Sequence, residues 1–444
     1  MTPNGVAIIG GSLAGLTVSR ELRAAGYRQP LTIVGAELQL PYDRPPLSKE
    51  FLLKQADVAL LSRAEAAELD IDWRLGQPAV SISTGRAGRH TVTIADGFNV
   101  TADVVVLATG ARARTLPGQP HIAGIHTLRT LDDASALRDS LSTCRNLVVI
   151  GAGFIGAEVA STATQLGINV TIVESSSAPL QTILGERLAA SCVKLHNENG
   201  VRLITGVGVE RILGTTRSEA VLLTDGTRLT ADCVVIGIGA TPNTEWLDYP
   251  GLLCCNGFRT DLLGRTTIDG IYAVGDCADR YDPYLDEHHR AEHWSNATTG
   301  ARIVAAAITG SEPPAPQAPY FWSHQYGHQL QFAGYRQPAD TVRLIEGDPE
   351  CGPFVATYER AGMPVAVFAR DSPRVFTRYR KQISSDLAAA AQRRCSAVSA
   401  AVHSARLEGG GPSALLSDEL RRFQQGGISV DDLVEHTVAR YRSR

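Results

Sequence analysis

The stretch VAIIGGSLAGLTVSRELRAAGYRQPLTIVGAE, which runs from Val6 to Glu37, decides how the rest of this chain is interpreted. The apolar run Val6 to Ile9 at its start predicts a buried strand, and the apolar spacing after the glycine-rich turn predicts a helix. A second apolar run, Leu31 to Val34, predicts another strand shortly before Glu37. In such a unit the turn and the helix N-terminus can face a pyrophosphate, while the acid can accept a hydrogen bond from a ribose hydroxyl. The stretch therefore predicts a dinucleotide site.

The glycine-rich turn departs at one position from the G-x-G-x-x-G pattern of such sites. It reads GGSLAG from Gly10 to Gly15, so that Ser12 stands where the middle glycine is expected. Serine is small enough to allow a close approach to the backbone. We expect this first site to be lined by Gly10, Ser12, Leu13, Ala14, Gly15 and Glu37.

The chain repeats the same unit as VVIGAGFIGAEVA from Val148, followed by an apolar strand that ends at Glu174. The similarity extends beyond the turn, because the pattern DG-x-x-x-TAD followed by an apolar run occurs at residues 96–107 and again at 225–236. Two Rossmann-like domains in tandem are therefore predicted. The alternative, two such domains that bind no nucleotide, leaves both glycine-rich turns and both acids without a role.

Composition and charge exclude several other classes of protein. The chain has 444 residues of which 44% are hydrophobic, which is enough for two or three domains with their own cores. It contains no apolar run of about eighteen residues and no basic segment followed by an apolar stretch at the N-terminus, so we expect a cytoplasmic protein without a membrane span. A net charge of -4 gives no general attraction to nucleic acid.

The segment PYDRPPLSKEF, Pro41 to Phe51, carries a resemblance to a known family. Its three prolines predict a rigid loop that delivers Arg44 and Lys49 to fixed places before a short helix. The loop resembles that of the FAD-dependent NADH:ferredoxin reductases, the family of putidaredoxin reductase and of the reductase components of aromatic-ring dioxygenases, within the pyridine nucleotide-disulfide oxidoreductase superfamily. Related disulfide reductases have a C-x-x-x-x-C pair here, and NADH peroxidases and oxidases have one cysteine. This loop has none, which leaves flavin as the two-electron store.

The resemblance implies an α/β fold of the glutathione-reductase-like flavoprotein type. Two tandem Rossmann-like dinucleotide-binding domains would be followed by a C-terminal α+β domain and a helical C-terminal extension. The expected bounds are 1–115 and 243–318 for a discontinuous FAD-binding domain, 116–242 for the NAD-binding domain, 319–392 for the C-terminal domain and 393–444 for the extension, whose role is unknown.

The resemblance also implies further contacts to FAD. The motif TIDGIYAVGD, which ends at Asp276, is similar to the family's second flavin motif, in which the aspartate ends a buried strand, precedes a helix and accepts from the ribityl chain. An N-cap without a ligand is the alternative role for that carboxylate. Trp294 is expected to stack on the flavin or to lie on the electron exit path, with packing alone as the alternative. The full set of further FAD contacts is Arg44, Lys49, Ala79, Thr109, Gly110, Arg129, Gly275, Asp276, Trp294 and Trp322.

The second domain is expected to bind NADH. A carboxylate at Glu174 accepts from a free 2′-hydroxyl but repels a 2′-phosphate, and the following Ser175 to Ser177 offer no arginine to bind one. NADH should therefore be preferred over NADPH. The predicted NAD contacts are Gly151, Gly153, Phe154, Ile155, Gly156, Glu158, Glu174 and Gly239.

Two residues are expected to act in the reaction. Glu158 resembles the family's glutamate that reaches toward the nicotinamide and pairs with the lysine of the proline-rich loop, which predicts an ion pair between Lys49 and Glu158 beside the flavin N5 edge. The alternative is an ordinary helix carboxylate and a surface lysine. A metal site built from Glu287, His288, His289 and His293 is not expected, because these residues lack a recurring ligand spacing.

The resemblance implies that hydride passes from NADH to FAD and that single electrons then pass to a [2Fe-2S] ferredoxin serving an oxygenase such as a cytochrome P450 or a ring-hydroxylating dioxygenase. Five cations between Arg370 and Lys381 predict a docking surface for the acidic ferredoxin near Arg374, Arg378, Arg380 and Lys381, with a solvated basic helix face as the alternative. Rubredoxin, quinone or oxygen could instead be the acceptor of the same flavin chemistry, and an NADH-gated interaction protein similar to apoptosis-inducing factor would share the fold. A monomer or a homodimer is expected.

The C-terminal extension has no counterpart in the resemblance. Its sequence predicts an alanine-rich helix ending near Leu407, a glycine-rich break at 409–412 and a last helix opening near 429–432. Val430, Leu433, Val434 and Val438 would form one apolar stripe on that last helix. The stripe needs a surface to cover, either on the same chain, on a second subunit or on a partner protein.

Overall fold

A computed structural model describes residues 3–85, 88–282, 284–285 and 287–407 of the chain, together with 413, 416–417, 419–420, 423 and 433–436. The predicted break at 409–412 lies outside the described residues, as do Val430 and Val438 of the predicted apolar stripe. Within the described part, no helix is both long enough and apolar enough to span a bilayer.

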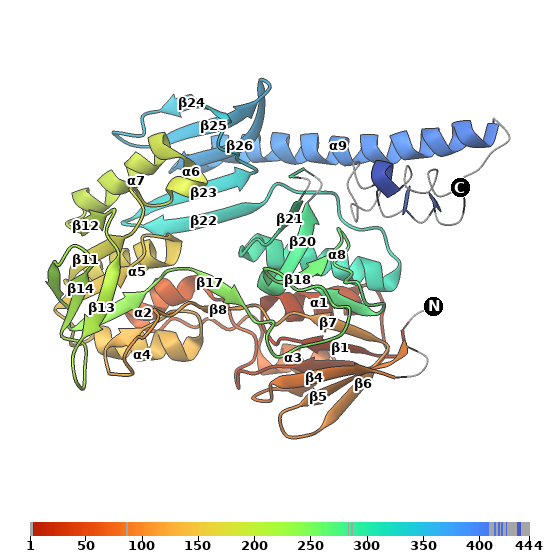
Figure 1. Ribbon diagram of the computed structural model, residues 1–444, viewed down its shortest axis with the longest axis horizontal. Coiled ribbons are helices and arrows are strands. Elements are labelled where there is room, and N and C mark those ends of the chain that lie inside the picture. The colour runs from red at the N-terminus through yellow and green to blue at the C-terminus, as the bar shows by residue number, and fades with distance from the viewer. Residues whose placement is uncertain are drawn as a thin grey trace.

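The first domain is built on a five-stranded parallel sheet in the order β19-β7-β1-β2-β3 (Figure 1). Its strands are β1 (Val6–Ile9), β2 (Leu31–Val34), β3 (Asp72–Arg74), β7 (Val104–Leu107) and β19 (Ile271–Ala273). Helices α1 (Leu13–Ala24) and α8 (Trp294–Thr309) pack side by side on one face, and a three-stranded sheet of β4 (Ala79–Thr84), β5 (His90–Ile94) and β6 (Asn99–Ala102) covers the other. Because side chains alternate along a strand, Ile8 packs toward the helices and Ile9 toward the small sheet.

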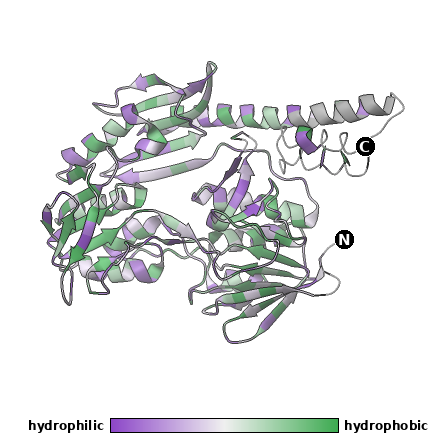
Figure 2. Cartoon of the chain, viewed as in Figure 1, coloured by the Kyte–Doolittle hydropathy of each residue, from purple (hydrophilic) through white to green (hydrophobic). Residues whose placement is uncertain are grey.

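The second domain repeats this plan strand by strand. Its parallel sheet has the order β12-β11-β10-β16-β9, and a three-stranded sheet of β13, β14 and β15 covers one face. The bounds are β9 (Ile125–His126), β10 (Asn146–Ile150), β11 (Asn169–Glu174), β12 (Arg202–Thr205), β13 (Val209–Leu213), β14 (Ala220–Leu223), β15 (Arg228–Thr230) and β16 (Cys233–Ile236). The tandem repeat predicted from the two glycine-rich turns is confirmed. Figure 2 shows the hydrophobic residues of both domains gathered on these strands and on the helices against them.

The helices on the other face of the second sheet come from three parts of the chain. They are α2 (Glu50–Lys54), α4 (Leu131–Leu141) and α5 (Phe154–Gln165). Phe51 and Leu52 of α2, which follow the proline-rich loop of the first domain, belong to the core of the second domain. Helix α4 lies in the connector, where no helix was predicted, and begins with a capping box formed by Thr130 and Asp133.

The C-terminal domain is a five-stranded antiparallel sheet in the order β22-β23-β26-β25-β24. Its strands are β22 (Tyr320–Gln325), β23 (His328–Gly334), β24 (Thr341–Gly347), β25 (Phe354–Arg360) and β26 (Met363–Arg370). One face packs on Leu184 of α6 (Gln181–Leu184) and Leu188 of α7 (Glu186–Glu198), and the other packs on α9 (Pro373–Leu407). Helix α9 runs without a break through the expected boundary at 392 and is described as far as Leu407.

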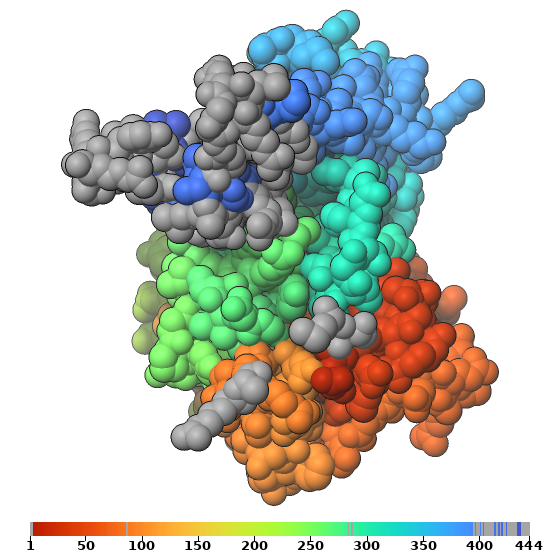
Figure 3. Space-filling view, turned by 90° about the vertical axis from the view of Figure 1, so that its right-hand side faces the viewer, coloured from red at the N-terminus to blue at the C-terminus, as the bar shows by residue number. Residues whose placement is uncertain are grey.

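Short elements join the three domains. Strands β8 (Ala111–Ala113) and β17 (Ala240–Pro242) pair where the chain passes between the two Rossmann-type domains. The other short elements are η1 (Pro45–Ser48), α3 (Arg63–Glu68), β18 (Phe258–Thr260), η3 (Gly275–Cys277), β20 (Ala278–Asp282) and β21 (Glu287–His289). In Figure 3 the teal segment around α8 lies between the red and orange first domain and the blue C-terminal domain. With the three domains joined in this way, four element ends lie close together, namely those of α1, α5, α8 and β22.

Candidate functional site

A cavity of about 740 Å³ lies where these element ends meet. It is lined by all but one of the residues predicted to contact FAD, namely Gly10, Ser12, Leu13, Ala14, Glu37, Arg44, Lys49, Ala79, Thr109, Gly110, Arg129, Gly275, Asp276, Trp294 and Trp322. The exception is Gly15, where an added Cβ would lie 2.1 Å from the carbonyl oxygen of Gly10. Gly15 therefore lets α1 pack closely against its own turn.

The glycine-rich turn of the first domain leaves room for a ligand. Gly10 has a φ of +131°, and an added Cβ would lie 2.0 Å from the carbonyl oxygen of Ala108, so only glycine fits there. Ser12 is the N-cap of α1, yet its side chain makes no capping hydrogen bond. The N-terminus of α1 therefore faces the cavity with N–H groups that a phosphate can satisfy.

The acid of the first domain is held by the proline-rich loop. Glu37 accepts a hydrogen bond from the phenol of Tyr42 and forms an ion pair with Arg44 at 2.7 Å. Burial raises the pKa of Tyr42 above its usual value, so the phenol remains a donor. Arg44 also donates to the carbonyl oxygen of Arg129, and this contact ties the loop to the connector over the cavity.

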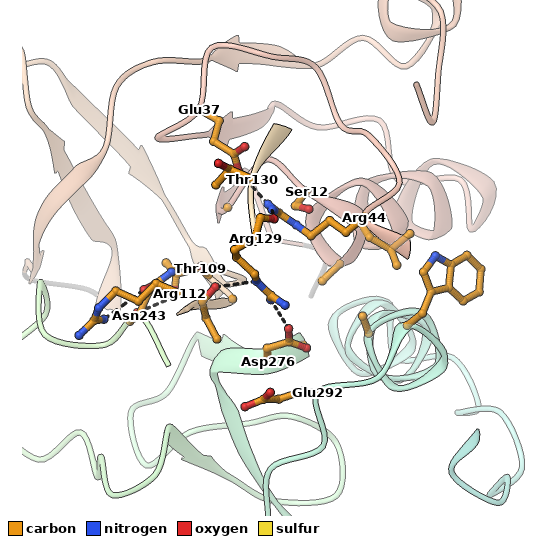
Figure 4. A pocket seen from close by; sticks show the side chains of 18 of the residues that line it. Ser12, Glu37, Arg44, Thr109, Arg112, Arg129, Thr130, Asn243, Asp276 and Glu292 are labelled. Atoms are coloured by element: carbon orange, nitrogen blue, oxygen red, sulfur yellow. Dashed lines mark hydrogen bonds and ion pairs between the residues drawn. The ribbon is translucent and has the colours of Figure 1, made fainter. Parts of the chain in front are cut away.

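Arg129 and Asp276 face each other across the cavity and form an ion pair (Figure 4). Arg129 is oriented by a 2.9 Å hydrogen bond to the carbonyl oxygen of Ala111. Asp276 lies in the short helical turn η3, which follows β19. Gly275, with a φ of +77°, turns the chain after β19, and α8 begins only at Trp294.

The predicted ion pair between Lys49 and Glu158 is present at 2.8 Å. The two side chains are 13% and 7% exposed, which excludes the alternative of a surface lysine and an ordinary helix carboxylate. Lys49 follows η1 at the end of the proline-rich loop, whereas Glu158 lies on α5 of the second domain. Phe154 and Ile155 of α5 line the same cavity.

The remaining residues predicted to contact NAD lie outside this cavity. They are Gly151, Gly153, Gly156, Glu174 and Gly239. Glu174 accepts 2.8 Å hydrogen bonds from the backbone N–H groups of Ala152 and Ser176, which fix its carboxylate beside the second glycine-rich turn. A Cβ added to Gly153 would meet nothing within 4 Å, so this turn is open to a ligand.

Trp294 forms part of the wall between this cavity and a second one. Its indole N–H donates to Asp43 at 2.8 Å, and its ring meets the ring of Trp322 edge-on with centroids 6.2 Å apart. Burial raises the pKa of Asp43. The ring of Tyr320 stacks on that of Trp322, with centroids 5.5 Å apart. Sequence reasoning missed Asp43, which stands in the quoted proline-rich loop, and Tyr320, which lies two residues before Trp322.

The second cavity, of about 660 Å³, shares Trp294 and Trp322 with the first, and its lining carries three arginines and one aspartate, Asp282. Its lining includes Arg280, Arg302 and Arg380. Arg380 lies 4.1 Å over the ring of Tyr320, and burial lowers the pKa of its guanidinium.

The five cations between residues 370 and 381 do not form one surface. Arg370 is 5% exposed and donates to the carbonyl oxygens of Pro349 and Gly352, so it holds the C-terminal sheet together. It is the last residue of β26 and points into the domain, whereas Arg374, Arg378 and Lys381 are exposed on α9. Arg370 is therefore excluded from the predicted docking surface.

In the described part of the chain, no three His, Cys, Asp or Glu side chains form a cluster that could hold a metal ion. His293 lines the first cavity and lies 4.8 Å from the ring of Phe321. Burial lowers the pKa of His293 to about 4, so its imidazole is neutral at pH 7.

The residues of the first cavity fit a flavin dinucleotide. The uncapped N-terminus of α1 suits the pyrophosphate, Glu37 suits a ribose, and Asp276 suits the ribityl hydroxyls. The buried indole N–H of Trp246, which also lines the cavity, has no hydrogen-bond partner among the described residues. A ligand with acceptor atoms would supply that partner.

Comparisons with known proteins agree with this geometry. The family model described as pyridine nucleotide-disulphide oxidoreductase matches residues 4–301, that of the reductase C-terminal domain matches 320–400, and that of antitoxin VbhA matches 394–440.

Curated relatives include the ferredoxin reductase component of chlorobenzene dioxygenase from Cupriavidus sp. (strain PS12), 40% identical over 84% of this chain and 90% of its own length. Putidaredoxin reductase from Pseudomonas putida is 35% identical over 86% of this chain and 92% of its own length. Among solved structures, the covalent complex of putidaredoxin reductase with putidaredoxin matches with a TM-score of 0.82, 33% identity, and coverage of 86% of this chain and 93% of that chain.

Proposed function

The chain belongs to the pyridine nucleotide-disulphide oxidoreductase family, and we propose that it is a ferredoxin reductase that passes electrons from NADH through FAD to a [2Fe-2S] ferredoxin. One observation carries the proposal. The first cavity is lined by the flavin-motif residues, by the Lys49–Glu158 pair and by Trp294 and Trp322. No described residue that lines it is a cysteine. Electrons can therefore enter and leave without a redox disulfide.

The residues of the first domain would hold FAD, and those of the second would hold NADH. Bound FAD would supply the chemistry, accepting a hydride from NADH and giving up electrons one at a time. Lys49 and Glu158 would align the nicotinamide, since both are buried and fixed at the border of the two domains. Glu174 would select NADH, because its carboxylate faces the second turn and would repel a 2′-phosphate.

The relatives favour ferredoxin as the electron acceptor. They include the ferredoxin reductase components of chlorobenzene and benzene dioxygenase systems and also rhodocoxin reductase and putidaredoxin reductase. Rubredoxin, quinone, oxygen and an NADH-gated interaction role are accordingly not favoured. The native ferredoxin would serve an oxygenase, and a cytoplasmic monomer or homodimer remains the prediction.

The ferredoxin would dock over the second cavity. Arg380 belongs to the predicted docking set and lines that cavity beside Arg302, while Arg374, Arg378 and Lys381 extend the positive charge along α9. Trp294 and Trp322 lie between this surface and the flavin residues. An acidic partner would be attracted there at low salt and less so at high salt.

The test is anaerobic reduction of cytochrome c by the FAD-loaded protein and NADH, with and without an added [2Fe-2S] ferredoxin. We expect the rate to depend strongly on ferredoxin and to fall as salt is raised. If NADH reduces the flavin but ferredoxin adds nothing to the rate, the acceptor assignment is wrong.

The match of residues 394–440 to the antitoxin VbhA model favours a second function for the C-terminal segment. We propose that this segment binds a toxin protein independently of electron transfer. The residues of α9 in the C-terminal core, Phe376, Ile383 and Leu387, all precede the segment. A chain ending at Arg393 should therefore keep full ferredoxin reduction.

The antitoxin role can be tested by co-expression with a toxin whose own antitoxin matches the same model. The full chain should restore growth and the chain ending at Arg393 should not. Equal growth with the two chains would overturn this second function.

A further inference from the structure

Glu158, on α5 of the second domain, is held by residues of the other two domains. Its Oε2 atom accepts from Lys49 at 2.8 Å and from the hydroxyl of Ser48, both in the proline-rich loop of the first domain. Its Oε1 atom accepts from the hydroxyl of Ser323 at 2.8 Å and from the backbone N–H of His324 at 3.4 Å, both on β22 of the C-terminal domain. The carboxylate thus connects three separate parts of the chain.

Glu158 and the two serines that donate to it are shielded from solvent. Glu158 is 6% exposed, Ser48 is 4% exposed and Ser323 is fully buried. A buried carboxylate needs hydrogen-bond donors from the protein, and hydrogen bonds to a charged group are stronger than those between neutral groups. The position of Glu158 therefore depends on these donors.

The direction of the Ser323 hydroxyl is set by a second residue. Gln325, two residues further along β22 and therefore on the same face, donates from its side-chain amide to the Ser323 oxygen at 3.0 Å. A hydroxyl has one proton to donate. With its oxygen accepting from Gln325, Ser323 directs that proton to Glu158.

We propose that Ser323, oriented by Gln325, is a positioning residue for hydride transfer. It fixes Glu158, and through Glu158 it fixes Lys49 at the wall of the flavin cavity. The inference rests on the proposed function, and it gives the C-terminal domain a role in the reaction with NADH as well as in docking. Ser48 acts in the same way on the other carboxylate oxygen.

The test compares Ser323→Ala with Ser384→Ala, a matched control. Ser384 is also largely buried in the C-terminal domain, where its hydroxyl accepts from the backbone N–H of Ala318, and it makes no contact with Glu158. Anaerobic single-turnover mixing with NADH should show flavin reduction slowed about tenfold in Ser323→Ala and by less than about twofold in the control. The dissociation constant for NADH and the rate of reoxidation by ferredoxin should change by less than about twofold in both.

A crystal structure of Ser323→Ala gives a readout that does not depend on turnover. We expect the Glu158 carboxylate to rotate and its contact with Lys49 to lengthen. If Ser323→Ala does not fold, Gln325→Leu provides the second variant, since it removes the donor to Ser323 and should slow flavin reduction in the same direction by a smaller factor.

The outcomes separate the two proposals. A parent protein that reduces no ferredoxin overturns the proposed function. A parent protein that works, with equal flavin reduction in Ser323→Ala and Ser384→Ala and an unmoved Glu158, overturns the positioning role.

Discussion

The two Rossmann-type domains share a strand order, a glycine-rich turn and an acid at or just beyond the end of the strand that follows the first helix, yet their sites differ in what covers them. In the first domain Glu37 is held by the side chains of Tyr42 and Arg44, which belong to a loop that closes over the cavity. In the second domain Glu174 is held by backbone N–H groups of its own neighbourhood.

The shared fold provides a glycine-rich turn and an acid in both domains, whereas the segments packed around the two sites differ. The proline-rich loop and the connector cover part of the first site and are joined by the contact of Arg44 with Arg129, as expected for a resident FAD. No described segment closes the second glycine-rich turn at Gly153 in the same way, as expected for NADH, which must enter and leave at each turnover.

The largest effect should come from adding a side chain to the glycine-rich turn of the first domain. Gly10→Ala places a Cβ 2.0 Å from the carbonyl oxygen of Ala108 at a φ of +131°, so we expect loss of FAD and destabilisation by about 3 kcal/mol or more. FAD content and thermal unfolding measure it. Gly97→Ala is the matched control, because Gly97 also has a positive φ but open space around it. FAD retained equally by both variants would contradict the role of Gly10.

The second largest effect should come from removing the cation that pairs with Glu158 between the two sites. Lys49→Met leaves Glu158 buried without its cation and should slow flavin reduction by NADH about 10- to 100-fold. Lys54→Met, at an exposed position at the end of α2, should leave the rate unchanged. Stopped-flow absorbance under anaerobic conditions measures both. An unchanged rate in Lys49→Met would remove this pair from the mechanism.

Replacing the acid of the first site and replacing that of the second site should have different consequences. Glu37→Ala leaves Tyr42 and Arg44 without their partner and should weaken retention of FAD about tenfold, with little change in the preference for NADH. Glu174→Ala combined with Ser176→Arg should shift the preference toward NADPH by about tenfold and leave FAD bound. FAD titration and the kcat/KM ratio for the two coenzymes separate the effects. Unchanged coenzyme preference in the double variant would count against Glu174.

The smallest effect should come from exchanging the middle residues of the two turns. A side chain at position 153 meets nothing within 4 Å, so Gly153→Ser should change stability by less than about 1 kcal/mol and raise the KM for NADH a few fold. Ser12→Gly should be nearly neutral for FAD, since Ser12 makes no capping hydrogen bond. A loss of stability in Gly153→Ser would show that the second turn is not open.

The parts predicted correctly from sequence are those with a local signal. The strands Val6–Ile9 and Leu31–Val34 were predicted with these bounds, because an apolar run and a glycine-rich turn are both visible in a few residues. Helix α4 was missed although its capping residues, Thr130 and Asp133, stand in the sequence.

Contacts between segments that are distant in the chain could not be predicted from the spacing of residues in the sequence. The hydrogen bonds of Ser323 to Glu158 and of Trp294 to Asp43 join residues of different domains or distant parts of one domain. The ion pair of Lys49 with Glu158 was found because the resemblance implied it, and not from the spacing of the two residues. Arg370 was assigned to the surface because a run of charges does not reveal that β26 ends at this residue and α9 begins at Pro373.

The assignment of the two sites can be tested by a crystal structure of the protein with FAD and NAD⁺. We predict that FAD fills the first cavity with its ADP half at Glu37, and that NAD⁺ extends from Glu174 to Glu158, where its nicotinamide reaches the wall of that cavity. NAD⁺ with its ADP half at Glu37, or a nicotinamide away from Glu158, would contradict this assignment.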